Sequence, residues 1–206
     1  MLKYLNTQMV FQEFPGETAL AINLTGCPNR CPGCHSPQLQ EDIGTPLTPE
    51  ELDRLIGPLV DTDSITCIGF MGGDVDHREL RRLLEYGKEH YPGLRWGWYS
   101  GFNVWSDEMI AGFDYVKLGS YKEALGDLTS PTTNQIMLKY IHCVDRWLDI
   151  TPYFRIRDKK YRNMVDEFEW AITTAHNTSD ASYDELFERF RANLINYGNK
   201  ISQTLR

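Results

Sequence analysis

The amino-acid sequence predicts an α/β fold with a mostly parallel sheet, and three observations indicate this class. Short apolar runs end in glycine turns, amphipathic helical patterns separate these runs, and the order strand, turn, helix, strand repeats up to Gly119. Such alternation is typical of βαβ units with right-handed crossovers. The chain has 206 residues, which is enough for one domain of ordinary size and a small appendage.

Four segments are predicted to form the strands of this sheet. They lie at residues 18–24, 64–70, 94–99 and 115–118. The first two are apolar runs of the kind found where both faces of a parallel sheet are covered. Glycine turns follow the second, third and fourth of these strands, at Gly72-Gly73, Gly101 and Gly119. Because ligands bind at the carboxyl ends of parallel strands, we expect these turns and the loop after the first strand to share one edge.

Helices are predicted between the strands, and a hairpin after them. The first helix begins at Thr48, whose side chain forms a capping box with Glu51. Further helices are predicted at residues 77–90 and 106–111, and a closing hairpin at residues 135–140 and 147–150. These assignments follow from helical and alternating apolar periodicity, respectively.

Charge and hydropathy exclude two classes of partner. The net charge is -8, and Arg78, Arg81 and Arg82, the nearest approach to a basic cluster, are interleaved with Glu79 and Glu85. We therefore expect no nucleic-acid binding, which requires a basic face. No segment reaches the roughly 20 apolar residues of a membrane-spanning helix. The first residues also lack the pattern of a secretory signal, so we expect a cytoplasmic protein without membrane contact.

Three of the five cysteines lie in one loop, TGCPNRCPGCHS, at residues 25–36. The spacing C-x3-C-x2-C brings together Cys27, Cys31 and Cys34. Three thiolates on one loop can bind three irons of a [4Fe–4S] cluster, because thiolates are the usual ligands of iron–sulfur centres. The fourth iron then has no protein ligand and is open to a small molecule, as a catalytic metal must be.

A zinc site is the competing interpretation of this loop. Zinc sites usually pair ligands at two-residue spacings with a second pair further on, and neither Cys67 nor Cys143 has such a partner. Both lie in apolar runs, so we interpret them as small core residues. For His35 three roles stay open, a ligand, a ring beside the cofactor or a surface residue, and we favour the second.

The cysteine loop resembles the signature of the radical S-adenosylmethionine enzymes. Its fuller form, CPNRCPGCHS, is similar to that of the activating enzymes of anaerobic ribonucleoside-triphosphate reductase. Three further segments resemble that family in the same order, MGGD at 71–74, WYSG at 98–101 and TNQ at 133–135. The resemblance covers about residues 1–157. It departs at His35, Val75 and Ile136, where the family often has an aromatic residue, proline and arginine.

The resemblance implies a partial (βα) barrel of the radical S-adenosylmethionine type and a defined activity. The amino and carboxylate groups of S-adenosylmethionine would chelate the open iron, and the reduced cluster would cleave the cofactor into methionine and a 5′-deoxyadenosyl radical. That radical would generate a glycyl radical on the partner, an anaerobic ribonucleoside-triphosphate reductase. A low-potential donor such as flavodoxin or ferredoxin would supply the electron. The protein would then be an oxidoreductase that activates a glycyl radical enzyme.

The same resemblance implies the site residues. The metal ligands would be Cys27, Cys31 and Cys34, and no catalytic residue is expected beyond the cluster and these ligands. The cofactor-binding residues would be Gly33, Cys34, His35, Gly72, Gly73, Asp74 and Ser100. Within this set, the turn at residues 72–74 would hold the ammonium group of S-adenosylmethionine through backbone carbonyls and a carboxylate.

Two alternatives and one further domain complete the prediction. A radical enzyme of small-molecule chemistry, similar to the deazaguanine-forming synthase, would need additional substrate-holding residues. A non-catalytic module with a structural zinc or a redox-silent cluster is the second alternative. Residues 158–206 are predicted to form a helical C-terminal extension to the core of residues 1–157. Its apolar stripe packs on its own domain in our interpretation, and docking of the reductase or of a second copy is the alternative hypothesis.

Overall fold

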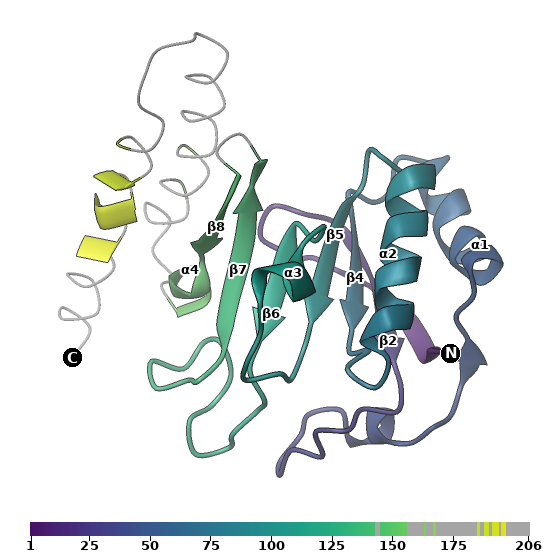
Figure 1. Ribbon diagram of the computed structural model, residues 1–206, viewed down its shortest axis with the longest axis horizontal. Coiled ribbons are helices and arrows are strands. Elements are labelled where there is room, and N and C mark those ends of the chain that lie inside the picture. Colours follow the sequence, from purple (N-terminus) through teal and green to yellow (C-terminus); the bar gives the residue numbers. More distant parts are fainter. Residues whose placement is uncertain are drawn as a thin grey trace, which may run out of the picture.

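The fold is built on an open sheet of eight strands, in the order β3-β1-β2-β4-β5-β6-β7-β8 (Figure 1). The computed structural model describes residues 1–142 and 145–155, together with isolated positions between 163 and 196. The strands are β1 Lys3–Val10, β2 Ala19–Leu24, β3 Thr45–Pro46, β4 Cys67–Met71, β5 Arg95–Tyr99, β6 Tyr115–Leu118, β7 Ile136–Ile141 and β8 Arg146–Asp149.

The centre of the sheet is parallel and its flanks are antiparallel. Strands β2, β4, β5 and β6 pair in parallel, as predicted from the repeated crossovers. The predicted closing hairpin is confirmed as β7 and β8, which pair antiparallel. The pairings of β1 with β2 and β3, and of β6 with β7, are also antiparallel. The mostly parallel sheet of the prediction is therefore a mixed sheet with a parallel core.

Strands β1 and β3 were absent from the sequence prediction. Only Tyr4 and Val10 of β1 are buried, so the strand lacks the apolar run by which the central strands were found. Strand β3 has only two residues and is fixed by pairing with Lys3 and Tyr4 of β1. Both strands depend on a neighbour that is distant in sequence, and local patterns do not report such pairing.

The helices are α1 Pro49–Val60, α2 His77–His90, α3 Asp107–Ile110 and α4 Thr151–Arg155, with a 3-10 helix, η1, at Pro37–Gln40. Helices α1, α2 and α3 begin at or next to the predicted residues, whereas α4 and the short helix η1 were not predicted. The side chain of Thr48 accepts a hydrogen bond from the Glu51 backbone N–H at 3.2 Å, as its capping box requires. Within the described residues, no helix has the length and apolar content needed to cross a bilayer. The predicted extension at 158–206 lies outside the described residues, apart from isolated positions.

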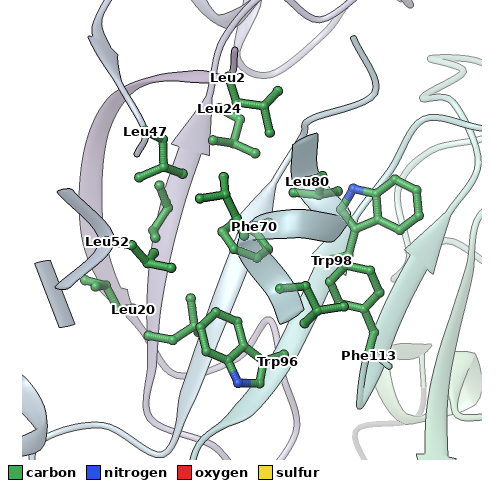
Figure 2. Close-up of a cluster of buried hydrophobic side chains, with 14 of the residues drawn as sticks. Leu2, Leu20, Leu24, Leu47, Leu52, Phe70, Leu80, Trp96, Trp98 and Phe113 are labelled. Atoms are coloured by element: carbon green, nitrogen blue, oxygen red, sulfur yellow. The ribbon is translucent and has the colours of Figure 1, made fainter. Parts of the chain in front are cut away.

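The main hydrophobic core lies between one face of the sheet and helices α1 and α2. Figure 2 shows its largest members, with Phe70 from β4 and Trp96 and Trp98 from β5, all fully buried. Leucines of the two helices close this core, among them Leu52 and Leu80. Because side chains alternate along a strand, the residues between these aromatic rings belong to the opposite face.

That opposite face is lined by small residues at the amino ends of the strands. Ala19 and Cys67 lie there, and the ring of Phe14 from the β1–β2 connection packs against Gly69 and Gly97 in the middle of β4 and β5. A Cβ atom at Gly97 would come within 2.1 Å of the Phe14 ring, so only glycine leaves room for it. The Phe14 ring also contacts Tyr99 edge-on, with ring centroids 5.4 Å apart. Phe14 thus covers this opposite face of the sheet at one end and leaves the carboxyl ends of the strands uncovered.

Gly97→Ala is expected to destabilise the protein by about 1–3 kcal/mol, the usual cost of overpacking a close-packed core. Gly57→Ala, in helix α1, is the matched control, since a Cβ atom there meets nothing within 4 Å. Its free energy of unfolding should change by less than about 1 kcal/mol, because the gain from replacing glycine in a helix is offset by crowding of the new Cβ against the ring of Pro58. Urea denaturation measures both free energies of unfolding. Equal stability of Gly97→Ala and the wild type would contradict the packing described for Phe14.

A polar cluster attaches β1 to helix α1. The Tyr4 hydroxyl donates to a Glu51 carboxylate oxygen, and the guanidinium of Arg54 donates to both Glu51 oxygens, at 2.7 and 2.8 Å. These hydrogen bonds, from Arg54 first and Tyr4 second, lower the pKa of Glu51 to about 2. The ionised carboxylate therefore connects an outer strand of the sheet to the helix that covers its core.

Glu51→Gln is expected to lower the free energy of unfolding at neutral pH. Because the folded-state pKa is depressed, the contribution of Glu51 is complete above its unfolded pKa and is lost as the pH falls through the folded value of about 2. The difference between variant and wild type should be constant from about pH 7 to pH 5 and shrink below about pH 4. Chemical denaturation across this range measures it. A difference that stays constant to about pH 3 would contradict the assignment.

Candidate iron–sulfur site

The cysteine loop lies at the carboxyl edge of the parallel strands, where it borders a cavity of about 520 Å³. In Figure 1 this loop, which follows β2, and the 119–135 segment, which follows β6, both lie at the lower edge of the sheet. Most of the predicted site residues line the cavity, namely Cys27, Cys31, Cys34, His35, Gly72, Asp74 and Ser100. The shared edge expected from the turn positions is therefore present.

Two predicted residues, Gly33 and Gly73, are not on the cavity wall. A Cβ atom on Gly33 would come within 3.2 Å of the Glu123 carboxylate, and one on Gly73 within 3.0 Å of Leu24. Both have positive φ, +70° and +99°. Their backbone conformations and close neighbours require glycine, because other residues rarely adopt this region.

The three thiols are partly exposed, and none forms a disulfide. The Cys27 sulfur accepts a hydrogen bond from the Asn29 side-chain amide at 3.7 Å, and the Cys34 sulfur accepts one from the Ser36 backbone N–H at 3.4 Å. N–H donors to sulfur are typical of iron–sulfur sites, where they help to set the reduction potential. Three free thiols beside one cavity, two of them with such donors, fit the ligand set of a cluster.

A site for a single metal ion, unlike a cluster site, needs all of its ligands around one point. Within the described part of the chain, no group of three or more His, Cys, Asp or Glu side chains is placed around one ion. Each thiolate of a cubane binds its own iron, so its three ligands need not share one coordination sphere. The spacing of Cys27, Cys31 and Cys34 is compatible with that arrangement.

Backbone hydrogen bonds hold the cysteine loop in place. The Gly26 N–H donates to Glu41 O at 2.9 Å, and the Cys27 N–H donates to Leu39 O at 3.0 Å, which ties the loop to the segment around η1. Gly26 has a φ of +74° and Arg30 one of +43°. These left-handed residues turn the chain sharply, so the loop is neither helix nor strand, as its prolines and glycines predict.

Asp74 bridges the cysteine loop and the end of β5. Its Oδ2 atom accepts hydrogen bonds from the Asn29 side-chain amide at 2.6 Å and from the Gly101 backbone N–H at 2.8 Å. Its Oδ1 atom is buried and has no hydrogen-bond partner within the described residues. One carboxylate oxygen therefore holds two parts of the protein together, and the other keeps its hydrogen-bonding capacity at the cavity wall.

Lys117 was missed by the sequence analysis. It lies on β6 and, among the residues that the structure describes, is the only lysine or arginine on the cavity wall. Its ammonium group donates to Gly119 O at 2.8 Å. Burial lowers the pKa of Lys117 to about 8, and the nearby Asp74 and cysteines act in the opposite direction. The alternation of side chains in YVKL could have placed Lys117 on the cavity side of the sheet. Lys117 shares a face with Tyr115, whereas Val116 points into the main core.

The 119–135 segment lies against the cysteine loop. The rings of His35 and Tyr121 are in contact, with centroids 4.7 Å apart. The Asn134 side-chain amide donates to Ser120 O at 2.9 Å, and the Gln135 amide donates to Gly119 O at 3.1 Å. The Thr-Asn-Gln element therefore joins the two ends of this segment. His35 is exposed and lines the cavity beside Cys34, and its place beside the cofactor stays a prediction.

Comparison with known proteins identifies the class of this site. Residues 15–132, more than half of the chain, match the family described as the 4Fe-4S single cluster domain. The chain belongs to this family. No curated protein and no solved structure matched the chain. The matched segment of the 4Fe-4S single cluster domain contains the complete cysteine loop, Asp74 and Lys117, and it supports the predicted iron–sulfur cofactor.

Cys67 lies apart from the cysteine loop of the cluster domain. It is fully buried on β4, and burial raises the pKa of its thiol well above the usual value. A thiol held protonated in this way is a poor metal ligand. The prediction that Cys67 is a core residue is confirmed, whereas Cys143 lies outside the described residues.

Replacement of Cys27, Cys31 or Cys34 by alanine is expected to abolish stable cluster assembly, because each removes one of three thiolate ligands. Cys67→Ala is the matched control and should keep the iron content of the wild type. Iron and sulfide analysis after anaerobic reconstitution, together with the brown absorbance of the cluster, measures the effect. Unchanged iron content in any of the three loop variants would refute the ligand assignment.

Proposed function

We propose that this protein is a radical S-adenosylmethionine activase that generates a glycyl radical on an anaerobic ribonucleoside-triphosphate reductase. One observation carries the proposal. The C-x3-C-x2-C cysteines lie beside a cavity of about 520 Å³ at the carboxyl ends of parallel strands. A cluster held by only three thiolates keeps one iron open, and this cavity offers room for a small molecule next to it.

The chain supplies ligands for the cluster and charges for the cofactor. Cys27, Cys31 and Cys34 would hold the cluster. When bound and reduced, it supplies the electron that cleaves S-adenosylmethionine into methionine and a 5′-deoxyadenosyl radical. The buried, unpartnered Oδ1 of Asp74 is suited to an ammonium group, and Lys117 to an anionic one. These two side chains therefore complement the two charges of an amino acid moiety.

The polar character of the cavity wall supports a protein substrate. Side-chain amides line it, those of Gln8, Gln12 and Asn23 among them. Amides both donate and accept hydrogen bonds, and so they match the backbone of an extended peptide. The sheet is open, as expected for the partial barrel that the sequence resemblance implies. An enzyme for a small molecule would instead close over its substrate.

The remaining components of the proposal concern partners. A low-potential donor such as flavodoxin or ferredoxin would reduce the cluster, and residues 158–206 are a candidate for docking the reductase. Neither nucleic acid nor membrane is part of the proposed activity, in line with the net charge of -8.

The reconstituted protein is expected to release 5′-deoxyadenosine when it is given dithionite and S-adenosylmethionine, because the proposed cluster leaves one iron open beside a cavity with room for the cofactor. Addition of an anaerobic ribonucleoside-triphosphate reductase should produce a glycyl radical, detected by EPR. Release of 5′-deoxyadenosine without a glycyl radical would favour small-molecule radical chemistry. Colourless protein with stoichiometric zinc would favour the non-catalytic module.

A further inference from the structure

We infer that Asn29 is a positioning residue that couples the cluster ligand Cys27 to Asp74 and tunes the cluster through a hydrogen bond to the Cys27 sulfur. The inference rests on the proposed role of Cys27 as a ligand. Asn29 itself does not contact a substrate in this scheme. It acts through the two side chains to which its amide donates.

The side-chain amide of Asn29 can donate two hydrogen bonds, and two acceptors lie within its reach. Its nitrogen lies 2.6 Å from Oδ2 of Asp74 and 3.7 Å from the sulfur of Cys27. A side-chain amide carries two N–H groups, so both hydrogen bonds can form at once. Because Asp74 is an anion, its hydrogen bond is the stronger of the two and fixes the orientation of the amide. The second N–H is thereby directed at the sulfur.

Asp74 in turn attaches this amide to the sheet. The oxygen that accepts from Asn29 also accepts from the backbone N–H of Gly101, at 2.8 Å. Gly101 follows Ser100, which is buried just after β5 ends at Tyr99 and whose backbone N–H donates to Lys117 O at 2.8 Å. The path from Cys27 through Asn29 and Asp74 therefore ends at the carboxyl end of β5 and connects the cysteine loop to this strand.

Gly101 provides an independent observation for the same contact. A Cβ atom at this position would lie 2.3 Å from the Asn29 side-chain nitrogen and 2.8 Å from its Cγ. Gly101 is not among the glycines with positive φ, so its backbone conformation alone does not require glycine. The absence of a side chain is explained by the space that the Asn29 amide occupies.

The hydrogen bond to sulfur has an electrostatic consequence. Reduction adds negative charge to a cluster and to its thiolates, and an N–H donor stabilises that charge. Removal of the donor should therefore lower the reduction potential of the cluster. Second-sphere contacts of this kind orient metal ligands and also tune the metal itself.

Asn29→Ala and Gly101→Ala test the coupling by two routes. The first removes the amide, and the second displaces it without changing Asn29. Gly93→Ala is the matched control, because a Cβ atom there meets nothing within 4 Å. After anaerobic reconstitution, iron content and the reduction potential are measured, the latter by redox titration followed by EPR. We expect both test variants to shift the potential to more negative values, and Gly93→Ala to keep the wild-type potential.

A double variant, Asn29→Asp with Asp74→Asn, separates the two roles of the amide. The introduced amide at position 74 can accept from the Gly101 N–H and donate to the introduced carboxylate at position 29. The hydrogen bond between positions 29 and 74, which we call the tether, is then restored with donor and acceptor exchanged. No donor then faces the Cys27 sulfur. We expect near wild-type iron content and a potential that remains below that of the wild type.

The outcomes distinguish this inference from the proposed function. Wild-type protein that assembles no cluster would overturn both. A wild-type cluster whose potential is unchanged in Asn29→Ala and Gly101→Ala would overturn the inference and leave the proposed function intact. If Asn29→Ala takes up no iron, uptake by the double variant supports the tether, and failure of the double variant overturns it.

Discussion

The alternation of side chains along β2, β4, β5 and β6 is the constraint on which the rest of the structure depends. One face of these parallel strands carries the large apolar residues that pack under α1 and α2. The other face carries small residues and the Phe14 ring, with Tyr99 and Lys117 towards the carboxyl ends. Because parallel strands all end at one edge, the cavity at that edge collects side chains from several strand ends, among them Asp74, Ser100 and Lys117.

The site combines charges of opposite sign that the fold holds apart. Lys117 enters the cavity from β6, and Asp74 from the turn after β4. The Lys117 ammonium group donates to Gly119 O, whereas Asp74 uses one oxygen for Asn29 and Gly101. Partly buried charges that keep hydrogen-bonding capacity are costly for stability and are typical of binding sites. Their presence beside the cysteine loop is the physical basis of our proposal that a zwitterionic cofactor binds here.

Glycines serve different purposes in this site, and the purposes explain the sequence motifs. Gly72 and Gly73 have positive φ and turn the chain after β4. Gly101 instead leaves space for Asn29, and Gly97 leaves space for Phe14. The Gly-Gly-Asp and Trp-Tyr-Ser-Gly segments, which the sequence analysis treated as separate pieces of a resemblance, are thus parts of one hydrogen-bonded unit with the cysteine loop.

The sequence by itself determined the class of the fold, the four central strands, the main helices and the cysteine triplet, because periodicity, caps and ligand spacing are local properties. It did not reveal β1, β3, Lys117 or Asn29. These depend on which distant segments become neighbours: β1 is a strand because β2 pairs with it, and Asn29 meets Asp74 across 45 residues. Only the tertiary structure decides such contacts, since the hydrogen bonds that define them do not exist until the sheet has assembled.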